Sequence, residues 1–270
     1  LLEEGFHRDL FKDTRLNYSF DELNKLFNGK LKRDTYKKWK LRLIPKGRKI
    51  PYFIPLWFIV KISEIADDKY PLRKIEENIV AYKGPSSSSI IWNPSLPLIE
   101  DERLLKILAH LLGDGHVGGG FGSKLPKGKS HSEYRNFERT LLDQFVKDLR
   151  VFGDVHTTTN YVHGDVIIPT VIGYIIEHIY SVKSSTFESR VPEVVSVLPR
   201  LIIASFIRAF ADDEGHVFDS SIELYSANKE LLSGIKGLFE DRFPQLDISC
   251  LKLNKKAGKN IKYSFSILST

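Results

Sequence analysis

Methionine is absent from the 270-residue sequence, and cysteine and glutamine occur only at Cys250, Gln144 and Gln245. A single cysteine excludes an internal disulfide and a thiolate zinc site, which favours a reducing, cytoplasmic compartment. The scarcity of thermolabile residues is typical of thermophilic proteins. Loss of modified methionines from the sequence is an equally good explanation, so both stay open.

Long apolar runs are also missing. The two longest, 54–62 and 166–176, are interrupted by proline, lysine or glycine, so neither is predicted to span a bilayer. No basic, apolar leader opens the sequence, and we expect no export. With 42% hydrophobic and 27% charged residues, the chain is expected to fold into one large or two ordinary globular domains.

The formal net charge of +6 is unevenly distributed. Residues 1–97 hold 19 lysines and arginines against 12 acids, whereas residues 98–270 hold 21 against 22. Ten of the basic residues fall between Lys30 and Lys49, with Asp34 as the one acid among them. Such density favours a polyanionic partner, because each neutralised phosphate releases condensed counterions. A solvated basic face is the alternative.

The spacing of apolar residues predicts three short helices in the N-terminal region. Asn17 or Ser19 starts a helix over 16–27, a basic helix follows over 32–42, and a third covers 57–66. Helix, tight turn and basic second helix is the arrangement of a helix-turn-helix reader of the major groove, although three small helices also build unrelated bundles. The candidate DNA-binding residues on the second helix are Lys37, Lys38, Lys40 and Arg42.

Residues 83–97 have the composition of a linker. They include Gly84-Pro85, four consecutive serines and Asn93-Pro94. We therefore place a boundary near residue 97, between a small all-α N-terminal domain over residues 1–97 and the rest of the chain.

Beyond this boundary, the same series of elements is predicted twice. The first series has a helix over 101–113, strands over 116–121 and 132–137, a helix over 136–152, strands over 155–159 and 165–168, and a helix over 170–180. The second has a helix over 200–213, strands over 216–218 and 221–225, a helix over 228–243, and strands over 247–253 and 261–268. This predicts an α+β fold with halves over residues 98–197 and 198–270, related by a pseudo-twofold axis.

The two halves share a signature segment. Leu111–Val117 and Phe210–Val217 each join an apolar helix to an acid, a glycine, a histidine and a valine, with Asp114 and Glu214 in equivalent positions. The glycines are ordinary helix stops. The acid before each glycine is unusual, because a carboxylate at a helix C-terminus is unfavourable by about 0.3–1 kcal/mol.

Small residues precede both acids by five positions, Ala109 in the first half and Ala209 in the second, so the two helices are predicted to pack closely. Close packing brings Asp114 and Glu214 together, and two carboxylates about 4 Å apart repel by roughly 4 kcal/mol at an effective dielectric of 20. A cation relieves this repulsion, and oxygen ligands with open positions suit Mg²⁺ together with phosphate and water. Asp114 and Glu214 are therefore predicted to be metal ligands acting on a phosphodiester.

Residues Ile107–Gly115 and Ile207–Gly215 resemble the paired signature helices of the LAGLIDADG homing endonucleases. Asp114 and Glu214 align with the family's last, metal-binding acid, and the two alanines align with its small helix-contact position. The earlier acid of the family pattern is retained only in the second copy, as Asp212. The resemblance covers residues 98–270.

The resemblance implies two αββαββα halves that form a DNA-binding saddle, in a monomer that acts as a pseudo-dimer on double-stranded DNA. It implies cleavage of both strands with Mg²⁺ or Mn²⁺ held by the two acids. A basic residue assists near the attacking water in the family, and Lys252 is the candidate here. Archaeal relatives append DNA-reading modules like the one expected in residues 1–97. A site-specific DNA endonuclease is therefore the expected function.

Two histidines and a basic loop are further candidates for DNA contact. His116 and His216 follow the acids and begin strands, where packing is the alternative to contact with DNA. Residues 123–130 approach a phosphate-binding loop but lack its first glycine, so Lys127 and Lys129 are expected at a hairpin tip that touches the DNA backbone or is only solvated. The G-x-G-x-x-G pattern over 113–118 follows a helix, which excludes a dinucleotide fingerprint.

Two other functions remain open. A transcriptional regulator on the same fold would bind DNA without cutting it, although such relatives tend to lose the acids that this sequence keeps. An intron RNA maturase would bind A-form RNA, whose narrow major groove hides the base edges that a saddle would read.

Overall fold

The computed structural model describes residues 1–65, 69–84, 89–118, 131–183, 188–254 and 262–268. The chain divides into two compact units. The N-terminal unit comprises Leu1–Tyr82 and Ile91–Pro97, and the second unit comprises Lys83–Ile90 and Leu98–Thr270. None of the helices in the described ranges has the length and apolar character that crossing a bilayer requires.

The N-terminal unit is mostly helical. Ser19 begins the second helix with a reciprocal cap: the backbone N–H of Glu22 donates to Ser19 Oγ, and the backbone N–H of Ser19 donates to the Glu22 carboxylate. The first and fifth helices and a two-stranded ribbon were not predicted, and part of the ribbon lies in the expected linker. The elements are α1 (Glu4–Asn17), α2 (Phe20–Leu26), α3 (Arg33–Lys40), α4 (Leu56–Ile65), α5 (Leu72–Glu76), β1 (Ala81–Tyr82) and β2 (Ile91–Trp92).

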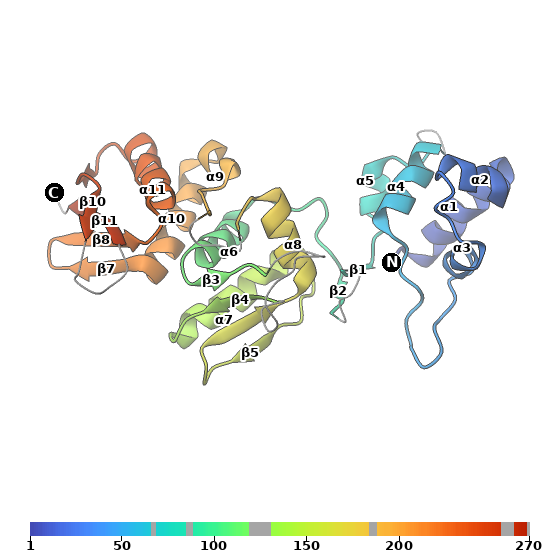
Figure 1. Ribbon diagram of the computed structural model, residues 1–270, viewed down its shortest axis with the longest axis horizontal. Helices are drawn as coiled ribbons and strands as arrows, with labels where there is room; N and C mark the ends of the chain where they lie inside the picture. The colour runs from blue at the N-terminus through green and yellow to red at the C-terminus, as the bar shows by residue number, and fades with distance from the viewer. Residues whose placement is uncertain (66–68, 85–88, 119–130, 184–187, 255–261, 269–270) are drawn as a thin grey trace. The chain divides into compact units, whose positions relative to one another are not determined.

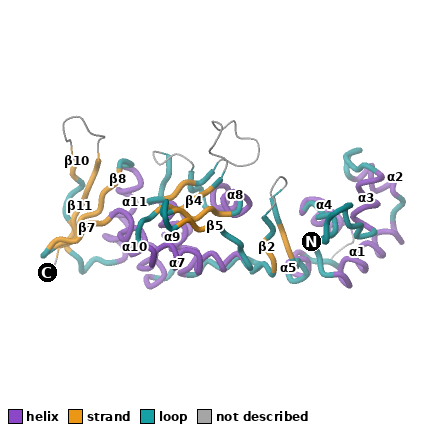
Figure 2. Tube along the Cα trace, turned by 90° about the horizontal axis from the view of Figure 1, so that it is seen from below, coloured by secondary structure: helices purple, strands orange, loops and turns teal. Residues whose placement is uncertain are grey.

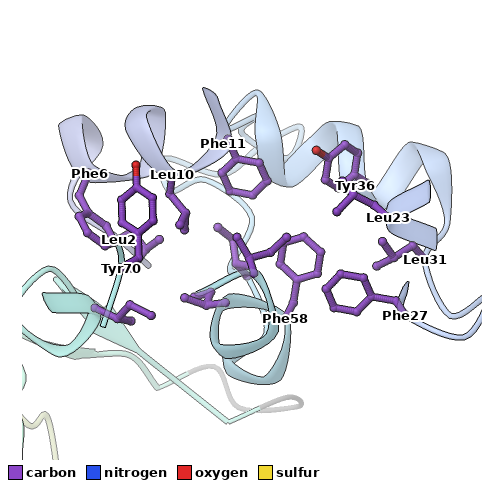
Figure 3. Close-up of a cluster of buried hydrophobic side chains, with 14 residues drawn as sticks. Leu2, Phe6, Leu10, Phe11, Leu23, Phe27, Leu31, Tyr36, Phe58 and Tyr70 are labelled. Atoms are coloured by element: carbon purple, nitrogen blue, oxygen red, sulfur yellow. The ribbon is translucent and has the colours of Figure 1, made fainter. Parts of the chain in front are cut away.

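Phe58 of α4 lies at the centre of the N-terminal core (Figure 3). Its ring is fully buried and lies 5.0 Å from the rings of Phe27 and Trp39 and 6.1 Å from that of Phe11, measured between centroids. These partners come from α1, from the residue that ends α2, and from α3. Aromatic packing on α4 therefore holds the first three helices together.

The first half of the second unit has the predicted element order. Asp101 begins its first helix by accepting hydrogen bonds from the backbone N–H groups of Arg103 and Leu104. The strands form an antiparallel sheet in the order β3-β4-β6-β5. Figure 2 shows β4 and β5 of this sheet. The elements are α6 (Glu102–Leu112), β3 (Gly115–His116), β4 (Ser132–Arg135), α7 (Arg139–Asp148), a 3₁₀ turn (Leu149–Phe152), β5 (Thr158–Asn160), β6 (Asp165–Ile168) and α8 (Thr170–Ile179).

The second half repeats this arrangement. Its sheet has the order β10-β11-β8-β7, with β9 also paired to β11, so that β7, β8, β11 and β10 correspond to β3, β4, β6 and β5. The predicted α+β fold with antiparallel sheets is confirmed, and α9 is an additional helix that the sequence did not predict. The elements are α9 (Glu193–Val197), α10 (Arg200–Glu214), β7 (Gly215–Phe218), β8 (Ser221–Ser226), α11 (Lys229–Arg242), β9 (Asp247–Ile248), β10 (Lys252–Asn254) and β11 (Lys262–Leu268).

Helices α6 and α10 pack against each other between the two sheets (Figure 1). Ala109 and Ala209 are buried on them, as close packing requires. The approach is close at Gly113, where a Cβ atom would lie 2.8 Å from the Cβ of Asp213. The C-terminal ends of the two helices therefore meet, and each end leads directly into a strand.

Each sheet has a buried and an open face. Tyr134 on β4 and Leu224 on β8 are fully buried, and side chains alternate along a strand, so their neighbours lie on the opposite face. Glu133 and Glu223 are such neighbours, and they pair with His116 and His216 across the strands. These faces carry polar residues next to the signature acids, with Glu133 buried and Glu223 half-buried.

Candidate active site

Two grooves lie where the signature helices turn into strands. Asp114, Gly115 and His116 line the first groove, and Glu214, Gly215 and His216, their equivalents, line the second. The remaining described lining residues are Glu133 and Arg135 in the first groove and Asp213, Phe218, Tyr225 and Lys262 in the second. The fold thus gives each half a groove that contains one signature acid and one histidine.

The two signature acids lie close enough for the charge of Asp114 to affect the ionisation of Glu214. Burial raises the pKa of Glu214 to about 7, and the negative charge of Asp114 adds to this shift. Burial also raises the pKa of Asp114 to about 6, with a further contribution from Asp213. The pair is therefore short of positive charge when both carboxyls are ionised, which is the condition that a cation relieves.

The charge of Lys262 acts on both acids. It lowers the pKa of Asp114 and that of Glu214, opposing the effect of burial, and it lines the second groove. Lys252, the residue predicted from the sequence, is exposed on β10 opposite Ser264 of β11. Both lysines lie on the same face of the sheet. Lys262 pairs with Asn254, which comes two residues after Lys252 on β10, and residues two apart on a strand share a face. Lys252 is one strand farther from β7.

Asp213 is a third acid at the end of α10, and its side chain is completely buried. One carboxylate oxygen accepts a 2.9 Å hydrogen bond from His110 Nδ1, and the other accepts bonds of 2.7 Å from Tyr134 Oη and 3.2 Å from Asn136 Nδ2. The buried charge of this acid is thus compensated by donors that all come from the first half. This arrangement holds the residue directly before Glu214 against α6 and β4.

The two grooves differ in the acids of their second strands. Glu133 is bound by His131 Nε2 at 3.0 Å and by Arg135 Nη2 at 2.7 Å, so its charge is already neutralised within the first half. The equivalent Glu223 accepts a hydrogen bond from Tyr225 Oη. Glu133 is therefore a poorer candidate for a metal ligand than its position alone suggests.

The donor set fits a hard divalent cation that keeps several non-protein ligands. Within the described ranges, no group of three or more His, Cys, Asp and Glu side chains could form a protein metal cage. Asp114 and Glu214 supply carboxylate oxygens at an open surface, which suits Mg²⁺ or Mn²⁺ completed by water and phosphate.

The predicted DNA-binding residues of the N-terminal unit are not equally available. Lys37 is exposed on α3, whereas Lys38 lies over the ring of Tyr52 and Lys40 over that of Tyr36, with Nζ 5.3 and 5.9 Å from the centroids. Arg42 Nη1 lies 3.7 Å from a carboxylate oxygen of Glu4. Lys127 and Lys129 lie outside the described residues.

Asp213 and Lys262 are the site residues that sequence reasoning missed. Asp213 stands in a run of three acids, Asp212 to Glu214, at the position where the first copy has Gly113. This difference between two otherwise similar segments could have identified Asp213 as a candidate from the sequence. Lys262 lies in the strand predicted over 261–268, but its place beside the acids depends on strand register, which one sequence does not determine.

Neither the family models nor the curated proteins contain a match to the sequence. Among solved structures, variants of the homing endonuclease I-DmoI are similar at 13% identity, over 62% of this chain and 89% of theirs, with a TM-score of 0.43. The homing endonuclease I-WcaI bound to its DNA recognition sequence is similar at 14% identity, over 63% and 76%, with a TM-score of 0.39. The N-terminal LAGLIDADG domain of DUF199/WhiA is similar at 12% identity, over 65% and 79%, with a TM-score of 0.37.

Proposed function

We propose that this protein is a site-specific endonuclease of the LAGLIDADG type, which hydrolyses both strands of duplex DNA with Mg²⁺ or Mn²⁺. The observation that supports this most strongly is the position of Asp114 and Glu214 at the ends of two packed, equivalent helices, where the charge of Asp114 raises the pKa of Glu214. Two partly buried carboxylates that lie close together reduce stability, so the presence of one such acid in each half favours a catalytic use.

The reaction is the attack of a water oxygen on phosphorus, with rupture of the bond to the leaving sugar oxygen, which takes up a proton. A bound divalent cation would supply Lewis-acid activation of the water and of the leaving oxygen. Asp114 and Glu214 would hold that cation. Lys262 adds positive charge beside the phosphodiester, where negative charge grows in the transition state.

Other residues position this machinery. Asp213 fixes the last turn of α10 through its three hydrogen bonds, and thereby orients the backbone that carries Glu214. His116 and His216 stand in the grooves next to the acids, where an imidazole N–H can donate to a phosphate oxygen. The open sheet faces would lie along the major groove as a saddle.

The test is cleavage of a randomised duplex library in the presence of Mg²⁺, with separate measurement of binding. We expect discrete cut sites for the wild-type protein. Asp114→Asn and Glu214→Gln should abolish cutting and leave binding within about threefold, because they remove the metal ligands without removing DNA-contacting cations. Asp212→Asn is the matched control, since Asp212 is an exposed acid of the same run that lines neither groove.

The other functions give different outcomes. Tight sequence-specific binding with no cutting under any divalent cation would assign the chain to non-cleaving regulators. Tighter binding to intron RNA than to duplex DNA would favour a maturase. Cleavage that survives Glu214→Gln would contradict the proposed metal site.

A further inference from the structure

The N-terminal unit carries a narrow arm between α3 and α4, over residues 41–55 (Figure 1). The backbone N–H of Tyr52 donates to the carbonyl of Leu43 at 3.1 Å and brings the two strands of the arm together. The backbone N–H of Arg48 donates to the carbonyl of Pro45 at 3.0 Å and closes a four-residue turn at the tip. The arm is therefore an ordered hairpin-like loop rather than an irregular connection.

Gly47 lets the tip turn sharply. Its φ of +77° falls in the left-handed region that a type II turn requires at its third residue, where glycine is favoured. A Cβ atom at Gly47 would meet nothing within 4 Å, so the glycine serves the backbone conformation and not close packing. The tip thus reverses the chain in minimal width, with open space around it.

The tip is strongly basic and unpaired. Residues 41–55 contain no acid, and the side chains of Lys46, Arg48 and Lys49 are exposed. Within the described part of the chain, none of these three forms an ion pair with a carboxylate. At the base of the arm, by contrast, Lys38 lies over Tyr52 and Arg42 lies near Glu4. The charge of the tip is therefore available to a polyanion.

Apolar side chains accompany this charge. Leu43 and Ile44, directly before the turn, are 41% and 54% exposed. A DNA groove offers matching chemistry, because its rims are phosphates, its walls are apolar sugar faces and its floor carries base acceptors. A smooth, uniformly hydrated polyanion would offer no partner for Leu43 and Ile44.

The basic side chains of the tip, and not its backbone, select the groove. The major groove admits a helix or a two-stranded ribbon, whereas the minor groove is only about 6 Å wide and attracts inserted arginine and lysine side chains. A·T pairs present only acceptors on the minor-groove floor, while G·C pairs add an amino donor that opposes a cationic side chain. A·T tracts are also narrower, and their negative potential is stronger.

We propose that the arm inserts its tip, Lys46 to Lys49, into the minor groove of A·T-rich duplex DNA. The inference rests on the proposed binding of DNA, and it adds a base-composition preference located in the N-terminal unit. The preference comes from Lys46 and Arg48, which flank the turn glycine and reach the groove floor from either side of it.

The test compares binding of the full-length chain to three duplexes at one fixed salt concentration: an A·T tract, a G·C tract, and the G·C tract with inosine in place of guanine. Inosine removes the minor-groove amino group and leaves the major-groove edge nearly unchanged. We expect the wild-type protein to bind the A·T and inosine duplexes roughly tenfold more tightly than the G·C duplex. Lys46→Gln/Arg48→Gln should reduce this ratio to near one.

The matched control is Lys147→Gln/Lys229→Gln, which removes the same charge from exposed positions on α7 and α11. It should weaken binding to all three duplexes equally and leave the ratio unchanged. Gly47→Val, which disfavours the turn without changing charge, should reduce the ratio as the charge variant does.

Three results would overturn the inference. The first is an arm variant that weakens all duplexes alike, and the second is a wild-type preference that inosine does not restore. The third is an arm variant that loses binding to vesicles of 30% phosphatidylserine and keeps its binding to DNA. Exposed apolar and basic residues also suit an anionic membrane. Cleavage without an A·T preference would contradict only this inference. An arm-dependent A·T preference without cleavage would contradict only the proposed nuclease function.

Discussion

His110 and Asp213 are joined across the two halves of the second unit by a hydrogen bond of 2.9 Å between Nδ1 of the imidazole and Oδ2 of the carboxylate. Their side chains are 3% and 0% exposed. Among the described residues, the donors to Asp213 come from the first half, and the equivalent residue of that half is Gly113, which has no side chain to return the interaction. The contact between the halves is thus polar and directional at its centre.

Replacing Asp213 by alanine should destabilise the second unit by about 3 kcal/mol, because three buried donors lose their acceptor. Urea unfolding followed by far-UV circular dichroism measures this loss. Tryptophan fluorescence serves as an internal control, since Trp39, Trp57 and Trp92 all lie in the N-terminal unit and should report an unchanged transition. Asp212→Ala, at an exposed neighbour, should cost much less, and equal costs would contradict the role given to Asp213.

Gly113→Ala and Gly237→Ala should have opposite effects on the free energy of unfolding. A Cβ at Gly113 would lie 2.8 Å from the Cβ of Asp213, so α6 and α10 must separate, at a cost of about 1–3 kcal/mol. Gly237 lies within α11 with nothing inside 4 Å of an added Cβ, so alanine there should stabilise by about 0.5–1 kcal/mol. Thermal or urea unfolding decides both, and stabilisation by Gly113→Ala would refute the close helix contact.

The metal-free protein should become less stable as the pH rises through the range in which Asp114 and Glu214 ionise. Their pKa values are raised from 3.8 to about 6 and from 4.5 to about 7, so the folded state binds more protons than the unfolded chain between these limits. Stability from protonation is fully present below the unfolded values and is lost as the pH rises through the folded ones. After allowance for solvent screening, the fall should amount to about 1–2 kcal/mol.

This fall is measured by urea unfolding in EDTA across that pH range. Asp114→Asn/Glu214→Gln should flatten the profile and raise stability at neutral pH, because neutral amides do not repel each other. A double variant that keeps the wild-type slope would show that other groups cause it.

Lys262→Met should reduce the rate of DNA cleavage by roughly 10- to 100-fold, because it removes the positive charge beside both acids. It should also raise the pKa of Glu214 further, which shifts the rising limb of the pH–rate profile to higher pH. Lys252→Met is the matched control on the same sheet face, and there we expect less than about a threefold change. A larger loss from Lys252→Met than from Lys262→Met would restore the sequence-based candidate.

Local signals predicted most elements of the second unit. The acid, glycine and histidine of each signature segment located the ends of α6 and α10, and the strand over Asp165–Ile168 was predicted with its observed bounds. The strand predicted over 155–159 lies later, at Thr158–Asn160, because pairing with β6 begins only at Thr158. Helix α1 was missed because its apolar residues are interspersed with charges and no capping signal begins it.

The site was only partly accessible to the same reasoning. The repeat identified Asp114 and Glu214 because equivalent unusual residues stand out in one sequence. Lys262 and the donors to Asp213 are brought in by strand pairing and by contact between elements that lie far apart in the sequence. Register and tertiary contacts of this kind leave no local pattern, so Lys252 and Lys262 were indistinguishable before the sheet was known.

The one-way hydrogen bonding at Asp213 has a consequence for assembly. Two copies of the first half would set imidazole against imidazole with no acceptor between them, and two copies of the second would bury carboxylate against carboxylate. Halves produced as separate polypeptides would therefore associate with each other and not with copies of themselves. The hydrogen bonds at Asp213, and not the covalent link between the halves, disfavour the symmetrical pairings.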